Sequence, residues 1–218
     1  MSKPSKPKQE IDATNFDLDL CFLSGVSFFQ IASAFFEKLP TDENEAARFA
    51  LNQRGGLFVA ATNLALAIEL LLKALAIARK RKVVPDHTLV TLFDALPLDY
   101  QQSIEYLYGQ EIRRPVAPHC IAVRLYISPV GVPVQQGPSE AVKKEGVSVR
   151  SVLEAESDAL KLWRYMHEAG DPAACVQITT LHYHLRVIGS AIIKHFALDP
   201  STHRIAKTVC HSAPGNNR

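Results

Sequence analysis

Apolar residues recur along this chain mainly at three- and four-residue steps, the spacing that gives a helix one buried face. We expect five helical stretches, at about 18–38, 56–82, 88–110, 151–168 and 174–196. Pro97 interrupts the third stretch, because proline removes a helical hydrogen bond. The pattern predicts an all-α protein of about five helices.

The stretch 18–38 carries signals at both of its ends. Asp17 or Asp19 can cap its N-terminus, and Pro40 stops it. The stretch 174–196 is also amphipathic, with an apolar face that includes Leu185, Ile188 and Ile192. Its opposite face is polar and includes His182, Arg186, Ser190 and Lys194.

The stretch 56–82 is apolar on nearly all sides, which is typical of a helix in the middle of a bundle or in a subunit interface. Between Arg54 and Glu69 it has 14 uncharged residues, fewer than the roughly 18 that a membrane-spanning helix needs. We therefore expect a buried helix of a soluble protein, with no membrane contact.

Four cations, at positions 79–82, end this stretch. Cations at a helix C-terminus stabilise the helix dipole, and this role needs no ligand. A contact with a polyanion is the alternative for the same residues.

The segment 112–149 differs from the rest of the chain, because it contains five prolines and three glycines. Within it, residues 121–127 are rich in β-branched and aromatic side chains, which favours a strand. We interpret the segment as a proline-rich insertion, a flexible flap that could hold a short β-hairpin.

The predicted domain organisation has three parts. Residues 1–16 form a flexible N-terminal segment, 17–197 form one helical domain that includes the insertion, and 198–218 form a loosely ordered C-terminal tail.

The composition is that of an ordinary globular protein, with 47% apolar and 21% charged residues among 218. A net charge of +2 gives no global signature of nucleic-acid binding. The first ten residues lack the apolar core of a signal peptide, and the four widely spaced cysteines contain no C-x-x-C. We expect a cytoplasmic protein with free thiols.

Motifs for the common chemistries are missing from the sequence. It contains no glycine-rich phosphate loop, no H-E-x-x-H and no G-x-S-x-G. His182 and His184 lie two residues apart, so on a helix they point to different sides. We therefore expect no metal and no cofactor.

Three strings together resemble the HEPN domain superfamily: AIELLLKAL at 67–75, DHTLVTL at 86–92 and LKLWRYMHE at 160–168. Its members are antiparallel helical bundles, typically bacterial or archaeal and often dimeric. They are linked to nucleotide or RNA binding and to defence or toxin–antitoxin systems. The resemblance implies the same fold here, a homodimer, and a nucleotide, RNA or protein partner.

The family's functional face lies near the second and last helices, which by resemblance points to Glu69, Lys73, His87, Arg164 and Tyr165 as ligand-binding residues. Structural roles explain the same residues. Glu69 and Lys73 are four apart and can pair along a helix, Arg164 can pair with the glutamate four residues later, and His87 can orient a turn.

Ribonucleases of the family carry R-x4–6-H at the start of the last core helix, where the arginine stabilises phosphate charge and the histidine transfers a proton. Here Arg164 and His167 are too close together, and 174–196 opens without an arginine. Arg114 and His119 fit the spacing but lie in a proline-broken loop. The sequence therefore predicts no catalytic residues, with Arg114, His119 and His167 as the candidates if catalysis occurs.

Three hypotheses follow. The first is a catalytically silent HEPN-like homodimer that binds a nucleotide, RNA or a protein. The second is a metal-independent ribonuclease that uses Arg113 or Arg114 with His119, assisted by His167. The third is an accessory subunit that docks on another protein through the insertion 112–149.

Overall fold

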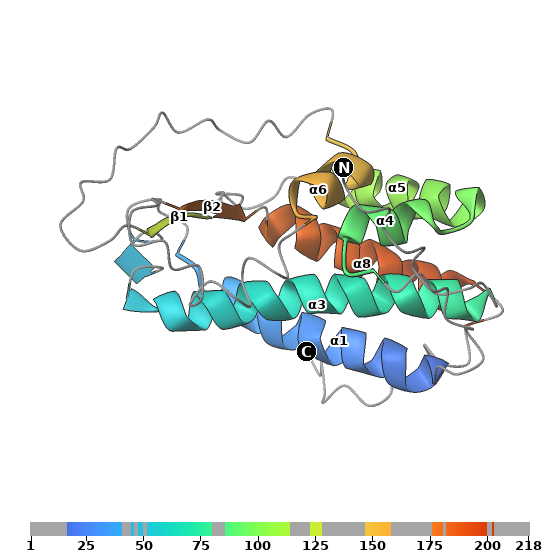
Figure 1. Cartoon of the computed structure of the whole chain (residues 1–218), viewed down its shortest axis with the longest axis horizontal. Coiled ribbons are helices and arrows are strands. Elements are labelled where there is room, and N and C mark those ends of the chain that lie inside the picture. The colour runs from blue at the N-terminus through green and yellow to red at the C-terminus, as the bar shows by residue number, and fades with distance from the viewer. Residues whose placement is uncertain are drawn as a thin grey trace, which may run out of the picture.

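The computed structural model describes residues 17–40, 45, 48, 49, 52–79, 86–113, 123–127, 147–157, 176–180, 182–199 and 202. Helices dominate these residues, which confirms the predicted all-α character (Figure 1). The elements in chain order are α1 (Leu18–Phe36), α3 (Arg54–Ala78), α4 (Leu89–Asp94), α5 (Leu98–Ile112), β1 (Val123–Ile127), α6 (Val149–Ala155), β2 (Val176–Thr180) and α8 (His182–Leu198).

Helix α1 begins at the predicted residue. The Asp17 carboxylate accepts a hydrogen bond from the Leu20 amide at 3.0 Å, so one of the amides left without a helical partner is satisfied. The helix ends at Phe36, shortly before Pro40.

Helix α3 lies in the middle of the described helices, with α1 along one side and α8 along another (Figure 1). Leu64, Ile68, Leu71 and Leu75 are fully buried. The all-round apolar pattern of 56–82 is thus explained by burial within the chain. Helix α3 is shorter than predicted at its C-terminus and ends at Ala78, and residues 80–85 lie outside the described part.

Two helices, α1 and α3, are long and apolar enough to cross a membrane by length and composition alone. This is weak evidence, because the buried core helix of a soluble protein passes the same test. The expectation of a cytoplasmic protein stays a prediction.

Contacts between α1 and α8 pair residues in opposite chain order. Phe22, early in α1, meets Phe196, late in α8, with ring centroids 4.2 Å apart. Phe36, the last residue of α1, stacks on His182, the first residue of α8, at 4.5 Å. The two helices therefore run in opposite directions along this interface.

Pro97 separates α4 from α5, as predicted from the sequence. Short helix α6 is fastened to both of them. The Glu105 carboxylate of α5 accepts hydrogen bonds from the amides of Val149 and Arg150 at 3.0 and 3.2 Å. The Arg150 guanidinium donates twice to Asp94 of α4. Helix α5 in turn packs on α8.

Helix α6 differs from the predicted stretch 151–168. It begins two residues earlier, because Ser148 and Ser151 form a reciprocal cap at its N-terminus. It ends at Ala155, and residues 158–175 lie outside the described part.

The prediction that a helix begins near residue 174 is wrong. Residues 176–180 form β2, which pairs with β1 in antiparallel register from Val123 opposite Thr180 to Ile127 opposite Val176. The sequence VQITT is rich in β-branched residues, which favour strands over helices. The described partner of β1 therefore comes from outside the insertion. Within the insertion, residues 114–122 and 128–146 lie outside the described part of the chain.

The close approach of α1 and α3 at Gly25 gives a stability prediction. A Cβ at Gly25 would lie 3.0 Å from Leu71 Cγ and 3.3 Å from the Leu71 backbone nitrogen. We expect Gly25→Val to lower the free energy of unfolding by about 1–3 kcal/mol in a urea titration. Gly109→Val on α5 is the matched control, because nothing lies within 4 Å of a Cβ there. Equal losses for the two variants would contradict this account of the interface.

Candidate functional site

Three of the five predicted ligand-binding residues meet in one cluster. Glu69 Oε1 accepts a hydrogen bond from Lys73 Nζ at 2.5 Å and lies 2.9 Å from His87 Nδ1. The Glu69 side chain is only 4% exposed, whereas that of His87 is 63% exposed. We call these residues the Glu69 cluster. It joins the middle of α3 to the segment that leads into α4.

Local sequence explains how the cluster forms. Glu69 and Lys73 lie one helical turn apart on α3, so their side chains share one face. His87 is placed by the turn before α4, in which the Asp86 carboxylate accepts hydrogen bonds from the Thr88 amide at 3.0 Å and the Thr88 hydroxyl at 2.8 Å. The i,i+4 spacing therefore predicted the Glu69–Lys73 pair, and the assignment of these three residues to ligand binding stays a prediction.

The cluster fixes the protonation geometry of His87. A carboxylate can only accept, so Nδ1 of the imidazole carries the proton toward Glu69 Oε1. Nε2 is then the ring atom left for solvent or a ligand. The second Glu69 oxygen, Oε2, is buried and has no hydrogen-bond partner among the described residues.

Cys21 of α1 lies beside the cluster. Its thiol donates to the Leu70 carbonyl at 3.3 Å. Burial raises the pKa of Cys21, the nearby Glu69 raises it further, and Lys73 opposes the shift. The thiol form is therefore favoured, and this cysteine is not an activated nucleophile.

The remaining predicted residues are not brought together by the described structure. Arg164 and Tyr165 lie outside the described residues, as do the catalytic candidates Arg114, His119 and His167. Arg113 is described and caps the C-terminus of α5.

Helix α8 buries three histidines, which the sequence pattern did not reveal. His182 was expected on the polar face but is 2% exposed, because the start of α8 packs on the end of α1. His184 lies 2.7 Å from the Tyr108 hydroxyl, and His195 lies 2.9 Å from the Ser103 hydroxyl. His182 and His184 have different neighbours, as their spacing predicted. Among the described residues, no group of three or more potential metal ligands occurs.

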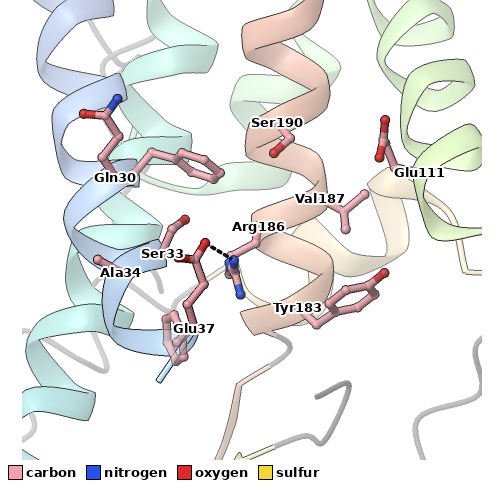
Figure 2. A pocket seen from close by; sticks show the side chains of 11 residues that line it. Gln30, Ser33, Ala34, Glu37, Glu111, Tyr183, Arg186, Val187 and Ser190 are labelled. Carbon is pink, nitrogen blue, oxygen red and sulfur yellow. Dashed lines mark hydrogen bonds and ion pairs between the residues drawn. The ribbon is translucent and has the colours of Figure 1, made fainter. Parts of the chain in front are cut away.

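A pocket between α1 and α8 is the second candidate site (Figure 2). Its volume is about 600 Å³, within the range of ligand sites. At its centre, the Arg186 guanidinium donates to Glu37 at 2.9 Å. Burial lowers the pKa of Arg186, while Glu37 opposes the shift. Sequence reasoning missed this pocket, because Arg186 and Glu37 are 149 residues apart.

The Glu69 cluster gives a stability prediction. Lys73→Met leaves a buried carboxylate without its ammonium partner, so we expect the free energy of unfolding to fall by about 3 kcal/mol in urea. The double variant Glu69→Leu/Lys73→Met should lose much less, because it removes the buried charge as well. Arg150→Met is the control, since it breaks exposed ion pairs with Asp94 and Glu154. A loss for Lys73→Met no larger than for Arg150→Met would contradict the cluster's role.

The buried histidines predict a pH dependence. Burial lowers the pKa values of His184 and His195 below the ordinary 6.5. As pH falls through about 6.5, the unfolded chain binds protons that the folded chain does not, so the folded state loses stability. Stability from these groups is thus present above pH 6.5 and declines below it, by up to about 1.4 kcal/mol per pH unit for each histidine.

Urea titrations between pH 7.5 and pH 5, in steps of about half a pH unit, measure this decline. The double variant His184→Gln/His195→Gln should flatten it. Tyr108→Phe is the control, because it removes the hydroxyl partner of His184 and keeps the histidine. An unchanged slope in the double variant would refute the assignment.

Comparison with known proteins adds no relative: no family model, no curated protein and no solved structure matches this chain.

Proposed function

We propose that this chain is a catalytically silent, HEPN-like antiparallel helical bundle that binds RNA or a nucleotide in the cytoplasm, in a bacterial defence or toxin–antitoxin setting. The observation that carries the proposal is the Glu69 cluster. Its three residues come from two of the three strings that resemble the family, they are separated by up to 18 positions, and they meet within hydrogen-bonding distance. Motif residues that converge in space support a shared role better than their sequence spacing does.

Charge near the cluster favours an anionic ligand. The exposed imidazole of His87 lies beside Glu69, and Arg79 caps the C-terminus of α3. The chain continues with Lys80, Arg81 and Lys82. Although the net charge of the chain is only +2, the sequence therefore has four cations in a row at positions 79–82. A phosphate backbone is the ligand class that such a concentration attracts.

Arg79 also holds α3 against α5, so we assign phosphate binding to Lys80, Arg81 and Lys82 instead. Its guanidinium pairs with Asp99 at 3.0 Å and lies over the Tyr100 ring at 4.5 Å from the centroid. The side chain thus also joins α3 to α5. The experiment below therefore alters positions 80–82 and His87 and leaves Arg79 intact.

The absence of catalysis in the proposal rests on sequence. Helix α8 contains one arginine, Arg186, and the next histidine, His195, follows nine residues later. This is not the R-x4–6-H spacing of the family's ribonucleases. A ribonuclease built from Arg114, His119 and His167, and an accessory subunit that docks through 112–149, are the rival proposals.

A homodimer remains part of the proposal, but its interface is now proposed on α1 instead of α3. Helix α3 is buried within the chain, so its all-round apolar surface no longer argues for a subunit interface. Exposed apolar side chains lie instead on α1, at Leu20, Leu23 and Ile31, which are 63%, 40% and 56% exposed. This face is the one on which a second copy is proposed to pack.

The test is binding of a fluorescently labelled single-stranded RNA by anisotropy, with EDTA present, at several salt concentrations. Lys80→Ala/Arg81→Ala/Lys82→Ala should lower the slope of log affinity against log salt by about 2, because three phosphate contacts are lost. His87→Ala should weaken binding several-fold. Lys3→Ala/Lys6→Ala/Lys8→Ala, with the same change of charge, and Tyr106→Ala, at an equally exposed side chain, are the controls and should bind as the parent does.

The same samples separate the rivals. RNA cleavage that His119→Ala abolishes would overturn the silent reading in favour of the ribonuclease. No RNA or nucleotide affinity, together with sedimentation as a 24.1 kDa monomer, would reject the proposal. Co-purification with one stoichiometric protein would favour the accessory subunit.

A further inference from the structure

The pocket between α1 and α8 holds two buried polar atoms with no hydrogen-bond partner in the described part of the chain. Ser33 Oγ and Arg186 Nε both line it, and neither has a hydrogen-bond partner among the described residues. Ser33 is 9% exposed. Buried donors are almost always satisfied in folded proteins, so two of them at one cavity call for an explanation.

The Ser33 hydroxyl does not make the hydrogen bond that a helical serine usually makes to its own helix. A helical serine usually donates to the carbonyl four residues earlier, as Ser27 does to Leu23 at 2.8 Å on the same helix. Figure 2 shows the Ser33 side chain on the pocket side of α1, beside Glu37 and Arg186. Its hydroxyl is therefore left for a molecule that takes the place of the Glu37 side chain.

The ion pair between Glu37 and Arg186 is easily broken, because Glu37 is largely hydrated. Its carboxylate accepts from the terminal nitrogen of Arg186, but its side chain is 65% exposed, whereas that of Arg186 is 24% exposed. A carboxylate so well hydrated can turn into water at little cost. The guanidinium then keeps its donors, including the Nε that has no partner among the described residues, for the molecule that replaces Glu37.

The walls determine the rest of the ligand. Phe29, Phe36 and Val187 provide an apolar lining, and Tyr183 adds a ring with a polar end. The charged groups of the lining are Arg186, Glu37 and Glu111, and Glu111 is paired with Lys194 from α8. With two carboxylates and one guanidinium around the pocket, binding of a dianionic ligand is disfavoured by charge repulsion, whereas a ligand with one negative charge is tolerated.

We propose that this pocket is a binding site for a small organic carboxylate with an apolar or aromatic body. The ligand carboxylate accepts hydrogen bonds from Arg186 Nε and Ser33 Oγ and displaces Glu37, and its body packs between Phe29 and Tyr183. The site lies between α1 and α8 and uses none of the residues assigned to RNA, so it stands independently of the function proposed above.

Titration calorimetry of the full chain with three matched compounds tests this site. Hydrocinnamate carries one negative charge, hydrocinnamamide is its neutral isostere, and phenyl phosphate carries up to two charges. Hydrocinnamate should bind at least about tenfold more tightly than the amide, because a charge-assisted hydrogen bond is lost in the neutral compound. Phenyl phosphate should bind more weakly than hydrocinnamate.

Two variants at the same ion pair should act in opposite directions. Arg186→Gln should abolish the preference for the carboxylate, whereas Glu37→Gln should tighten hydrocinnamate binding several-fold, because it removes the competing carboxylate. Ser33→Ala should weaken binding without removing it. Arg150→Gln, which alters an exposed arginine on α6, is the control and should leave binding unchanged.

The opposite results are equally decisive. Absence of saturable hydrocinnamate binding at millimolar concentration, equal binding of the amide, or weaker binding in Glu37→Gln would each overturn the proposal. Because Glu37 is exposed, its variant should fold even if Arg186→Gln does not. Tighter binding of phenyl phosphate would overturn the assignment to a carboxylate.

Discussion

The structure depends on covering one helix that is apolar on nearly every side. Helix α3 buries large side chains such as Leu64 and Ile68 completely, and each such residue contributes about 2–3 kcal/mol when it leaves water. A single neighbour cannot cover the whole circumference, so α1, α4 and α8 all pack on α3. Glycines allow the necessary closeness. A Cβ at Gly25 of α1 would press on Leu71, and one at Gly189 of α8 would lie 3.2 Å from Ile68. The arrangement of the other elements is thus a consequence of α3.

The same constraint makes polar groups in this core costly, and their pairing sets where chemistry can occur. Glu69 lies on α3 itself, and a carboxylate buried there must be compensated, which Lys73 and His87 do at one of its oxygens. On α8, the imidazoles of His184 and His195 each contact a hydroxyl of α5, so they can remain neutral and still be hydrogen-bonded. Glu69, His184 and His195 are thus each paired with a polar group from a second segment of the chain. Among the described residues five buried polar atoms have no partner, and two of them, Ser33 Oγ and Arg186 Nε, are found together at the pocket.

What the sequence revealed follows from how local each signal is. The start of α1 at Leu18 depends on Asp17 three residues before the amide it caps, so it was predictable. The Glu69–Lys73 pair is one helical turn long and was predictable for the same reason. Strand β2 was mistaken for the start of a helix, because an alternating run of β-branched residues gains its meaning only from pairing with β1, more than 40 residues away. His182 was predicted to be exposed, because helical periodicity describes one helix at a time and carries no information about the Phe36 ring of α1 that covers it.

The two candidate sites differ in the physics of recognition. In the Glu69 cluster the buried charges already neutralise each other, so the proposed attraction for an anion comes from the exposed His87 and from the run of cations at positions 79–82 of the sequence. Attraction of that kind acts through solvent and is screened by salt within about 10 Å. At the pocket, by contrast, the two unpartnered donors, Ser33 Oγ and Arg186 Nε, are buried and directional. Interactions of desolvated groups are screened far less. A polyanion held by the first site should therefore lose affinity steeply as salt rises, whereas a compact carboxylate held by the second should lose much less.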